Sequence, residues 1–235
     1  LKKIFYYAFP FIMIDVFKSL YNSIDVVMLV SVLVKGLGYT ATDAETIMSV
    51  ISTWGLKINM IVIAIATGIT VSLIPNISSS FVKKDMKTVN EKNNQSLQML
   101  LYLVVPMTVG LSILAKPVWT IFYGPSQYGP SVYSFYVFVA LATTLFTITI
   151  TTVQLMKEYR QVFRCLICGF LTNVVLNVPL LYAFDSIGLP AYFGSTLSTI
   201  LGYLVCSFMC LHFLLKKYHI VYEETIRRVF DILIA

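Results

Sequence analysis

Two long apolar runs with charged side chains inside them constrain this chain more than any other feature. The first run covers Phe9–Val34 and contains two aspartates and a lysine, and the second covers Met48–Pro75 and contains one lysine. These four residues are Asp15, Lys18, Asp25 and Lys57. Each run is long enough to cross a bilayer, where a charged side chain at the centre costs about 2.5–3.5 kcal/mol on insertion scales. We therefore expect these charges to face one another or a wet cavity rather than lipid.

Composition identifies the class of protein. Hydrophobic residues make up 58% of the chain, charged residues 12%, and the mean hydropathy is +0.82. A soluble domain has about twice that share of charged residues. The sequence predicts an all-α, polytopic membrane protein. It begins with Leu1 and has no signal peptide pattern, so we expect it to be part of a longer chain.

Six apolar segments are long enough to span the bilayer. They cover approximately Tyr6–Leu33, Met48–Phe81, Leu97–Leu114, Val132–Met156, Phe163–Phe184 and Leu189–Leu215. We assign residues 1–217 to one six-helix transmembrane lobe. Residues 218–235 are expected to be a cytoplasmic tail whose last residues begin a further transmembrane helix.

The lysines and arginines between the spans predict the orientation. One side receives Lys2, Lys3, Lys83, Lys84, Lys87, Lys92, Lys157, Arg160, Arg164, Lys216, Lys217, Arg227 and Arg228. The other side receives only Lys35 and Lys116. Because basic loops stay in the cytoplasm, both ends of the chain are expected on the cytoplasmic side of the plasma membrane.

Several function classes do not fit the sequence. The net charge of +6 comes from loops between spans rather than from one basic face with aromatic residues, so we expect no nucleic acid partner. The cysteines lie in apolar segments, and no motif of a hydrolase, metalloprotease or nucleotide-binding loop occurs, so we expect no metal, no cofactor and no enzyme activity. Cys206 and Cys210 are interpreted as small packing residues.

Small and polar residues inside the spans predict helix packing. Ala64, Gly68 and Ser72 recur every four residues, and so do Gly194, Ser198, Gly202, Cys206 and Cys210. Such stripes allow two helix backbones to approach closely in lipid. Asn173 and Asn177 share one helix face, which favours hydrogen bonding between helices. The threonine-rich run Thr143–Gln154 is expected to be a helix whose hydroxyls bind its own carbonyls, because an open strand is excluded from lipid.

Depth along the spans predicts which charges can meet. At 1.5 Å per residue, Asp25 and Lys57 both lie about 9 Å to the outer side of the midplane. We expect these two to approach each other, and Asp15 and Lys18 to pair on one helix face. Two interpretations stay open. The charges either neutralise one another inside the bundle or, together with Asn22, line a hydrated cavity and bind or gate a charged substrate.

Several stretches resemble the multidrug/oligosaccharidyl-lipid/polysaccharide (MOP) exporter superfamily. Ile63–Asp85 is similar to the end of its eighth helix and Phe9–Leu29, with the SID element at Ser23–Asp25, to its seventh. Val105–Gly124 and Asn173–Thr199 also resemble family segments. The resemblance covers nearly the whole chain and fits best the polysaccharide-transporter branch, with its lipid II flippases and spore-cortex relatives from Gram-positive bacteria.

This resemblance implies two six-helix lobes that face each other in a V around a central cavity, with this chain as the second lobe, helices seven to twelve. It implies an N-terminal lobe as partner, membrane lipids as surroundings, and a lipid-linked glycan flipped by alternating access. Lys57 and Lys18 would meet the diphosphate, with Asp15 and Asp25 as their partners. Two alternatives are a cation-coupled drug or metabolite exporter of the same superfamily and a membrane scaffold for cell-envelope assembly.

Overall fold

The computed structural model describes residues 2–223, 225 and 227, and all regular structure within them is helical. The helices are α1 (Lys2–Lys35), α2 (Ala41–Ser49), a π-helix (Val50–Trp54), α3 (Gly55–Val82), α4 (Met86–Ile113), α5 (Ala115–Tyr123), α6 (Gly129–Tyr136), α7 (Phe138–Leu155), α8 (Tyr159–Ser186) and α9 (Tyr192–Tyr218).

Within this described part, six helical stretches are long and apolar enough to cross a membrane. The predicted all-α, six-span architecture is therefore confirmed. The second and fourth spans each combine two helices, α2 with α3 and α6 with α7. The third begins eleven residues before the expected Leu97, at Met86. The preceding Asp85 caps this helix by accepting hydrogen bonds from the backbone and hydroxyl of Thr88, which hold the pKa of Asp85 below its usual value.

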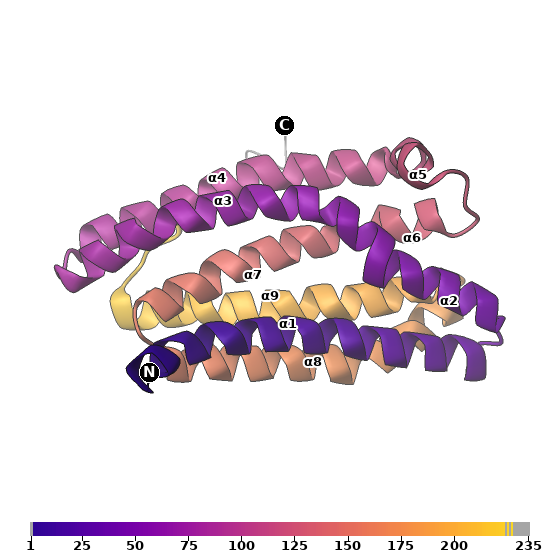
Figure 1. Ribbon diagram of the computed structural model, residues 1–235, viewed down its shortest axis with the longest axis horizontal. Coiled ribbons are helices and arrows are strands. Elements are labelled where there is room, and N and C mark those ends of the chain that lie inside the picture. Colours follow the sequence, from indigo (N-terminus) through magenta and orange to yellow (C-terminus); the bar gives the residue numbers. More distant parts are fainter. Residues whose placement is uncertain (1, 224, 226, 228–235) are drawn as a thin grey trace.

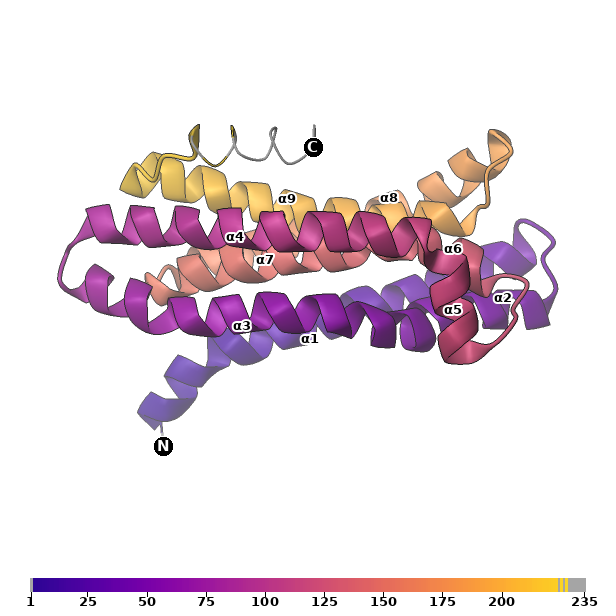
Figure 2. The same ribbon diagram turned by 90° about the horizontal axis from the view of Figure 1, so that it is seen from above.

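The bundle is organised around α7 (Figures 1 and 2). The span that contains α7 is the most buried of the six, and Phe146, Ile148 and Ile150 of α7 are fully buried. Helix α1 packs against α8 and α9, whereas α3 packs against α4 and α7. The two helices that carry the predicted charges therefore belong to different sides of the bundle.

Helices α8 and α9 form the closest pair, and the small residues of α9 explain why. A Cβ on Gly194 would lie 2.5 Å from the carbonyl carbon of Leu180, and one on Gly202 would lie 2.8 Å from the carbonyl oxygen of Gly169. Cys206 and Cys210 continue this buried stripe, with free thiols. The expected role of this stripe in close helix packing is confirmed.

The predicted stripe of small residues on α3 does not pack against a neighbouring helix. Ala64, Gly68 and Ser72 are exposed, and a Cβ on Gly68 would meet no atom within 4 Å. The expectation of close packing there is wrong within the described residues, because α3 turns its opposite side, with Val62, Ala66 and others, toward α4 and α7.

The second span bends at the π-helix Val50–Trp54, where α2 meets α3 (Figure 1). A π-helix replaces the regular i→i+4 backbone hydrogen bonds of an α-helix by i→i+5 bonds. At its end, the carbonyl of Trp54 accepts a hydrogen bond of 3.0 Å from the hydroxyl of Tyr123 in α5. Gly55 follows directly, and a Cβ there would lie 3.0 Å from the ring of Tyr136. The bend is therefore fixed by packing against α5 and α6.

The threonine-rich run forms α7, as expected. The hydroxyls of Thr144, Thr147, Thr149 and Thr152 donate to carbonyls three or four residues earlier in the helix. These bonds satisfy the hydroxyl groups of threonines on a helix that crosses the membrane inside the bundle, where water is not there to bind them.

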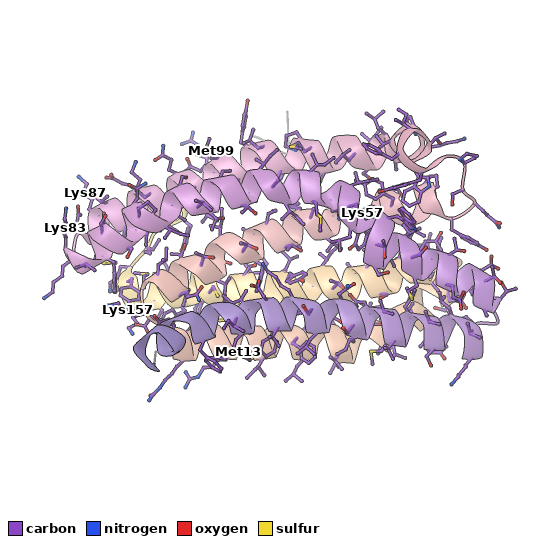
Figure 3. The ribbon with its side chains drawn as sticks, viewed as in Figure 1. Met13, Lys57, Lys83, Lys87, Met99 and Lys157 are labelled. Atoms are coloured by element: carbon purple, nitrogen blue, oxygen red, sulfur yellow. The ribbon has the colours of Figure 1, made fainter. Side chains whose placement is uncertain are left out.

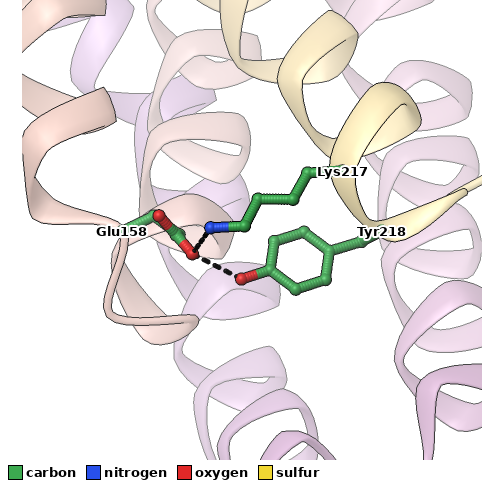
Figure 4. A network of polar contacts seen from close by, with 3 residues as sticks. All are labelled: Glu158, Lys217 and Tyr218. Atoms are coloured by element: carbon green, nitrogen blue, oxygen red, sulfur yellow. Dashed lines mark hydrogen bonds and ion pairs between the residues drawn. The ribbon is translucent and has the colours of Figure 1, made fainter.

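A polar network joins the start of α8 to the end of α9 (Figure 4). Glu158 forms an ion pair with Lys217 and accepts a hydrogen bond of 2.5 Å from the hydroxyl of Tyr218. Partial burial opposes ionisation of Glu158, but the two donors outweigh it, so the pKa of Glu158 lies below its usual value. The network fixes α9 where it ends.

After α9 the chain passes His219, which has a left-handed backbone, and lies against α4. Asn90 and Asn94 of α4 bind the backbone N–H and carbonyl of Val221, at 3.2 and 2.8 Å. Thr225 accepts from Gln98 and donates to Asn94. Most of the predicted further helix lies outside the described residues, so the division at residue 217 stays a prediction.

Candidate functional site

Asp25 is the most enclosed of the four predicted charges. It lies in the second half of α1 and is 5% exposed. Its Oδ1 accepts hydrogen bonds from the side-chain amides of Asn173 (3.2 Å) and Asn177 (2.9 Å) of α8. Its Oδ2 accepts from the hydroxyl of Thr199 of α9, at 2.5 Å. A buried carboxylate needs such donors, and here they come from two other helices.

The two asparagines also bind α9. The amide of Asn177 donates to the hydroxyls of Ser195 and Ser198, and that of Asn173 donates to the hydroxyl of Thr199. The expected interhelical role of Asn173 and Asn177 is confirmed, and it includes a third helix that the spacing did not indicate. The network holds α1, α8 and α9 together.

The predicted pairing of Asp25 with Lys57 is wrong. Lys57 is exposed at the bend between α2 and α3, with its Nζ 4.8 Å from the ring centre of Trp54 (Figure 3). The one ion pair among the described residues is that of Glu158 with Lys217. Equal depth did not bring Asp25 and Lys57 together, because α1 and α3 pack on different partners.

The predicted ion pair of Asp15 with Lys18 is also wrong. Lys18 is half-buried, and its Nζ lies 5.7 Å from the ring centre of Phe146 of α7. Asp15 is exposed, in a shallow hollow on the outside of α1 beside Ser19 and Ser23. Lys18 packs toward α7, and no ion pair links it to Asp15 among the described residues, although the two are three residues apart on one helix.

A cleft of about 310 Å³ lies between α1 and α3. Helices α7 and α9 contribute to its lining, and three of the five predicted site residues line it, namely Lys18, Asn22 and Asp25. Lys57 and Asp15 do not line it. The remaining lining residues are Ser19, Tyr21, Ile51, Leu56, Asn59, Ile63, Tyr136, Val139, Ala140, Thr143, Thr199 and Tyr203.

The faces of the bundle differ in what they expose at membrane depth. Helices α1 and α3 expose charged, polar and small residues among apolar ones: Asp15, Ser19, Asn22, Ser23, Lys57, Thr67, Gly68 and Ser72. In their middle turns α4 and α8 expose apolar side chains: Met99, Tyr102, Val109, Ile167, Leu171 and Val175. Charged groups are expensive in lipid, so the face of α1 and α3 suits water or protein, and the other faces suit lipid.

Sequence reasoning did not place Asn59, Tyr136 or Thr199 in the site. Asn59 is recognisable as an amide inside an apolar span, whereas Tyr136 and Thr199 stand in apolar or small-residue stretches with no local signal of function. These residues come from α3, α6 and α9 and line one cleft with residues of α1, a grouping that helix periodicity does not reveal.

Comparison with known proteins gives the family. The family model described as "Lipid II flippase MurJ" matches residues 52–234. The chain belongs to the MurJ family. It is 30% identical over 228 residues to the lipid II flippase MurJ of Bacillus subtilis (strain 168), a match that covers 95% of this chain. The resemblance to the polysaccharide-transporter branch is thereby confirmed.

The chain spans 40% of the length of this MurJ relative. No solved structure matches the chain significantly. Membership in the MurJ family, together with six apolar helices, makes this a multi-pass membrane protein.

Proposed function

We propose that the full-length protein is a flippase that moves an undecaprenyl-diphosphate-linked peptidoglycan precursor across the plasma membrane. This chain would supply one lobe, family helices seven to twelve, opposite an N-terminal lobe. The observation that carries the proposal is the polar face of α1 and α3 at membrane depth in a MurJ-family chain. A transporter needs such a face for its aqueous path.

The residues on this face have distinct roles in the proposal. Lys57 is exposed without a carboxylate partner among the described side chains, so its charge is free to meet the diphosphate. Lys18 supplies a second positive charge at the cleft, with Asn22 as a neutral hydrogen-bonding neighbour. Asp15 is exposed on the same helix and would order water or gate the path.

Asp25 has a different role. Its carboxylate is already held by Asn173, Asn177 and Thr199, so it supports the wall of the path from behind. The two lobes would rock around the bound headgroup while the prenyl chain stays in lipid, and no covalent bond would be made or broken. Both ends of this chain would lie in the cytoplasm.

Complementation tests the proposal. In a cell depleted of its lipid II flippase, the full-length protein should restore growth, and Lys57→Ala should abolish or strongly reduce this rescue at equal expression. Lys116→Ala is the matched control, because Lys116 is exposed in α5, away from the cleft, and should rescue fully.

Three outcomes would contradict the proposal. Failure of the unmodified protein to rescue would favour an exporter of another substrate. Full rescue by Lys57→Ala would remove the role of Lys57. Full rescue by the double variant Lys18→Met with Lys57→Met would favour a scaffold.

A further inference from the structure

We propose that the cleft between α1 and α3 binds one sugar ring of the lipid-linked substrate. This rests on the proposed flippase function and specifies which part of the substrate the cleft holds. The diphosphate would remain at the mouth of the cleft, with Lys57 on the exposed face and Lys18 in the lining as its positive charges.

The size of the cleft suits a single ring. Its volume of about 310 Å³ is at the lower end of the range for small-molecule sites, about 300–1,000 Å³. The cleft lies at the level of Lys18–Asp25 on α1 and opens beside the exposed residues Ser19 and Asn22. A ring can therefore enter from the polar face, while a prenyl chain has no need to leave the lipid.

The lining offers the polar groups that a sugar requires. A hydroxyl both donates and accepts, so a site for several hydroxyls needs both kinds of partner. Asn22 and Asn59 carry amides and Thr143 carries a hydroxyl, and all three line this cleft. They come from α1, α3 and α7, so they surround the space.

Asn59 gives the most specific indication. It is 1% exposed, and its amide nitrogen donates to the carbonyl of Tyr136 at 3.3 Å. Its amide oxygen has no hydrogen-bond partner among the described residues. Leaving a buried acceptor unsatisfied is costly, and a ligand hydroxyl in the cleft would supply the donor after a small rotation of the amide.

Aromatic residues complete the lining. Tyr21 and Tyr203 stack with ring centres 4.5 Å apart and planes 11° apart, and Tyr136 lines the same cleft. Tyrosine combines an apolar ring with a hydroxyl, which matches the mixed apolar and polar faces of a sugar.

The groups in the cleft favour a neutral ligand. Lys18 and Asp25 both line it, and the carboxyl oxygens of Asp25 already accept hydrogen bonds from Asn173, Asn177 and Thr199. A phosphate in the cleft would place its oxygens beside the carboxyl oxygens of Asp25, and a hydrocarbon chain would leave the amide oxygen of Asn59 without a donor. A neutral ring with hydroxyls avoids both costs.

Binding to two probes tests the proposal in the full-length protein. The probes are undecaprenyl diphosphate alone and undecaprenyl diphosphate linked to one hexosamine, each measured by native mass spectrometry or fluorescence titration. Ser19→Leu fills the mouth of the cleft at an exposed helix position that tolerates leucine. We expect it to weaken binding of the sugar-linked probe about tenfold and to change binding of undecaprenyl diphosphate by less than about twofold.

Ser31→Leu is the matched control. It makes the same substitution on the same helix at another exposed serine, outside the cleft, and both probes should bind as in the unmodified protein. Equal effects of Ser19→Leu on both probes, or no effect on either, would overturn the sugar site and leave the flippase function in place. An unmodified protein that binds neither probe would overturn the flippase function itself.

Discussion

Asp25 shows how a single buried charge is accommodated in this protein. It receives three hydrogen bonds from uncharged donors, whereas Lys57 and Asp15 are exposed and Lys18 is half-buried. A carboxylate with several donors does not need a basic partner. The geometry also fixes the direction of each bond, because Asn173 and Asn177 must present their amide nitrogens to Asp25.

Because Asn173, Asn177 and Thr199 all donate to Asp25, residue 25 must supply acceptors. Asp25→Asn would replace one of the two acceptor oxygens by an amide nitrogen that faces a donor, and we expect the free energy of unfolding to fall by about 1–3 kcal/mol. The double variant Asp25→Asn with Asn177→Asp exchanges donor and acceptor and should recover part of this loss. Denaturation of the purified protein in detergent micelles measures both.

Asp15→Asn is the control for this pair of variants. Because Asp15 is exposed, its substitution should change the free energy of unfolding by less than about 0.5 kcal/mol. The losses in free energy of unfolding caused by Asp25→Asn alone and by Asn177→Asp alone are added for comparison. If the double variant lost as much as this sum, the proposed donor arrangement would be wrong.

At the scale of helices, the two stripes of small residues differ in whether they contact another helix. The stripe of α9 is buried against α8, where backbone atoms leave no room for a side chain at Gly194. The stripe of α3 is exposed on the polar face, with open space at Gly68. Close helix packing therefore depends on where a stripe points, which spacing alone does not give.

Gly194→Ala should destabilise the chain by about 1–3 kcal/mol, because its Cβ would lie 2.5 Å from the backbone of Leu180 and would force α8 and α9 apart. Gly110→Ala in α4 is the matched change, since a Cβ there meets nothing within 4 Å. Alanine is the better helix former by about 1 kcal/mol, so this control should be neutral or stabilising. Thermal unfolding curves of both variants test this, and equal stability of the two would contradict it.

At the scale of the whole molecule, the bundle has distinct ends and faces. Lys83, Lys87 and Lys157 lie at the same end (Figure 3). The face of α1 and α3 exposes charged and polar residues among apolar ones, whereas the middle turns of α4 and α8 expose apolar side chains. This combination suits a lobe that stands upright in the bilayer with one face turned to a water-filled path.

The orientation can be tested by labelling single cysteines in intact cells, in a background with the native cysteines replaced by alanine. Gln127→Cys, in the loop between α5 and α6, should react with a membrane-impermeant maleimide. Lys87→Cys, at the basic end, should react only after permeabilisation, because basic loops stay inside. The reverse pattern would contradict the orientation.

The sequence by itself determined the helical class, the six spans and the packing stripe of α9. These follow from local rules, because a segment of apolar residues in lipid must satisfy its own backbone. It also selected Lys18, Asn22 and Asp25, which line one cleft. Counting residues along the spans placed Asp25 and Lys57 at the same depth in the membrane, but depth does not specify which helices are neighbours. Only the tertiary structure decided that α1 lies against α8 and α9, and that Asp25 is therefore held by Asn173, Asn177 and Thr199 rather than by a lysine.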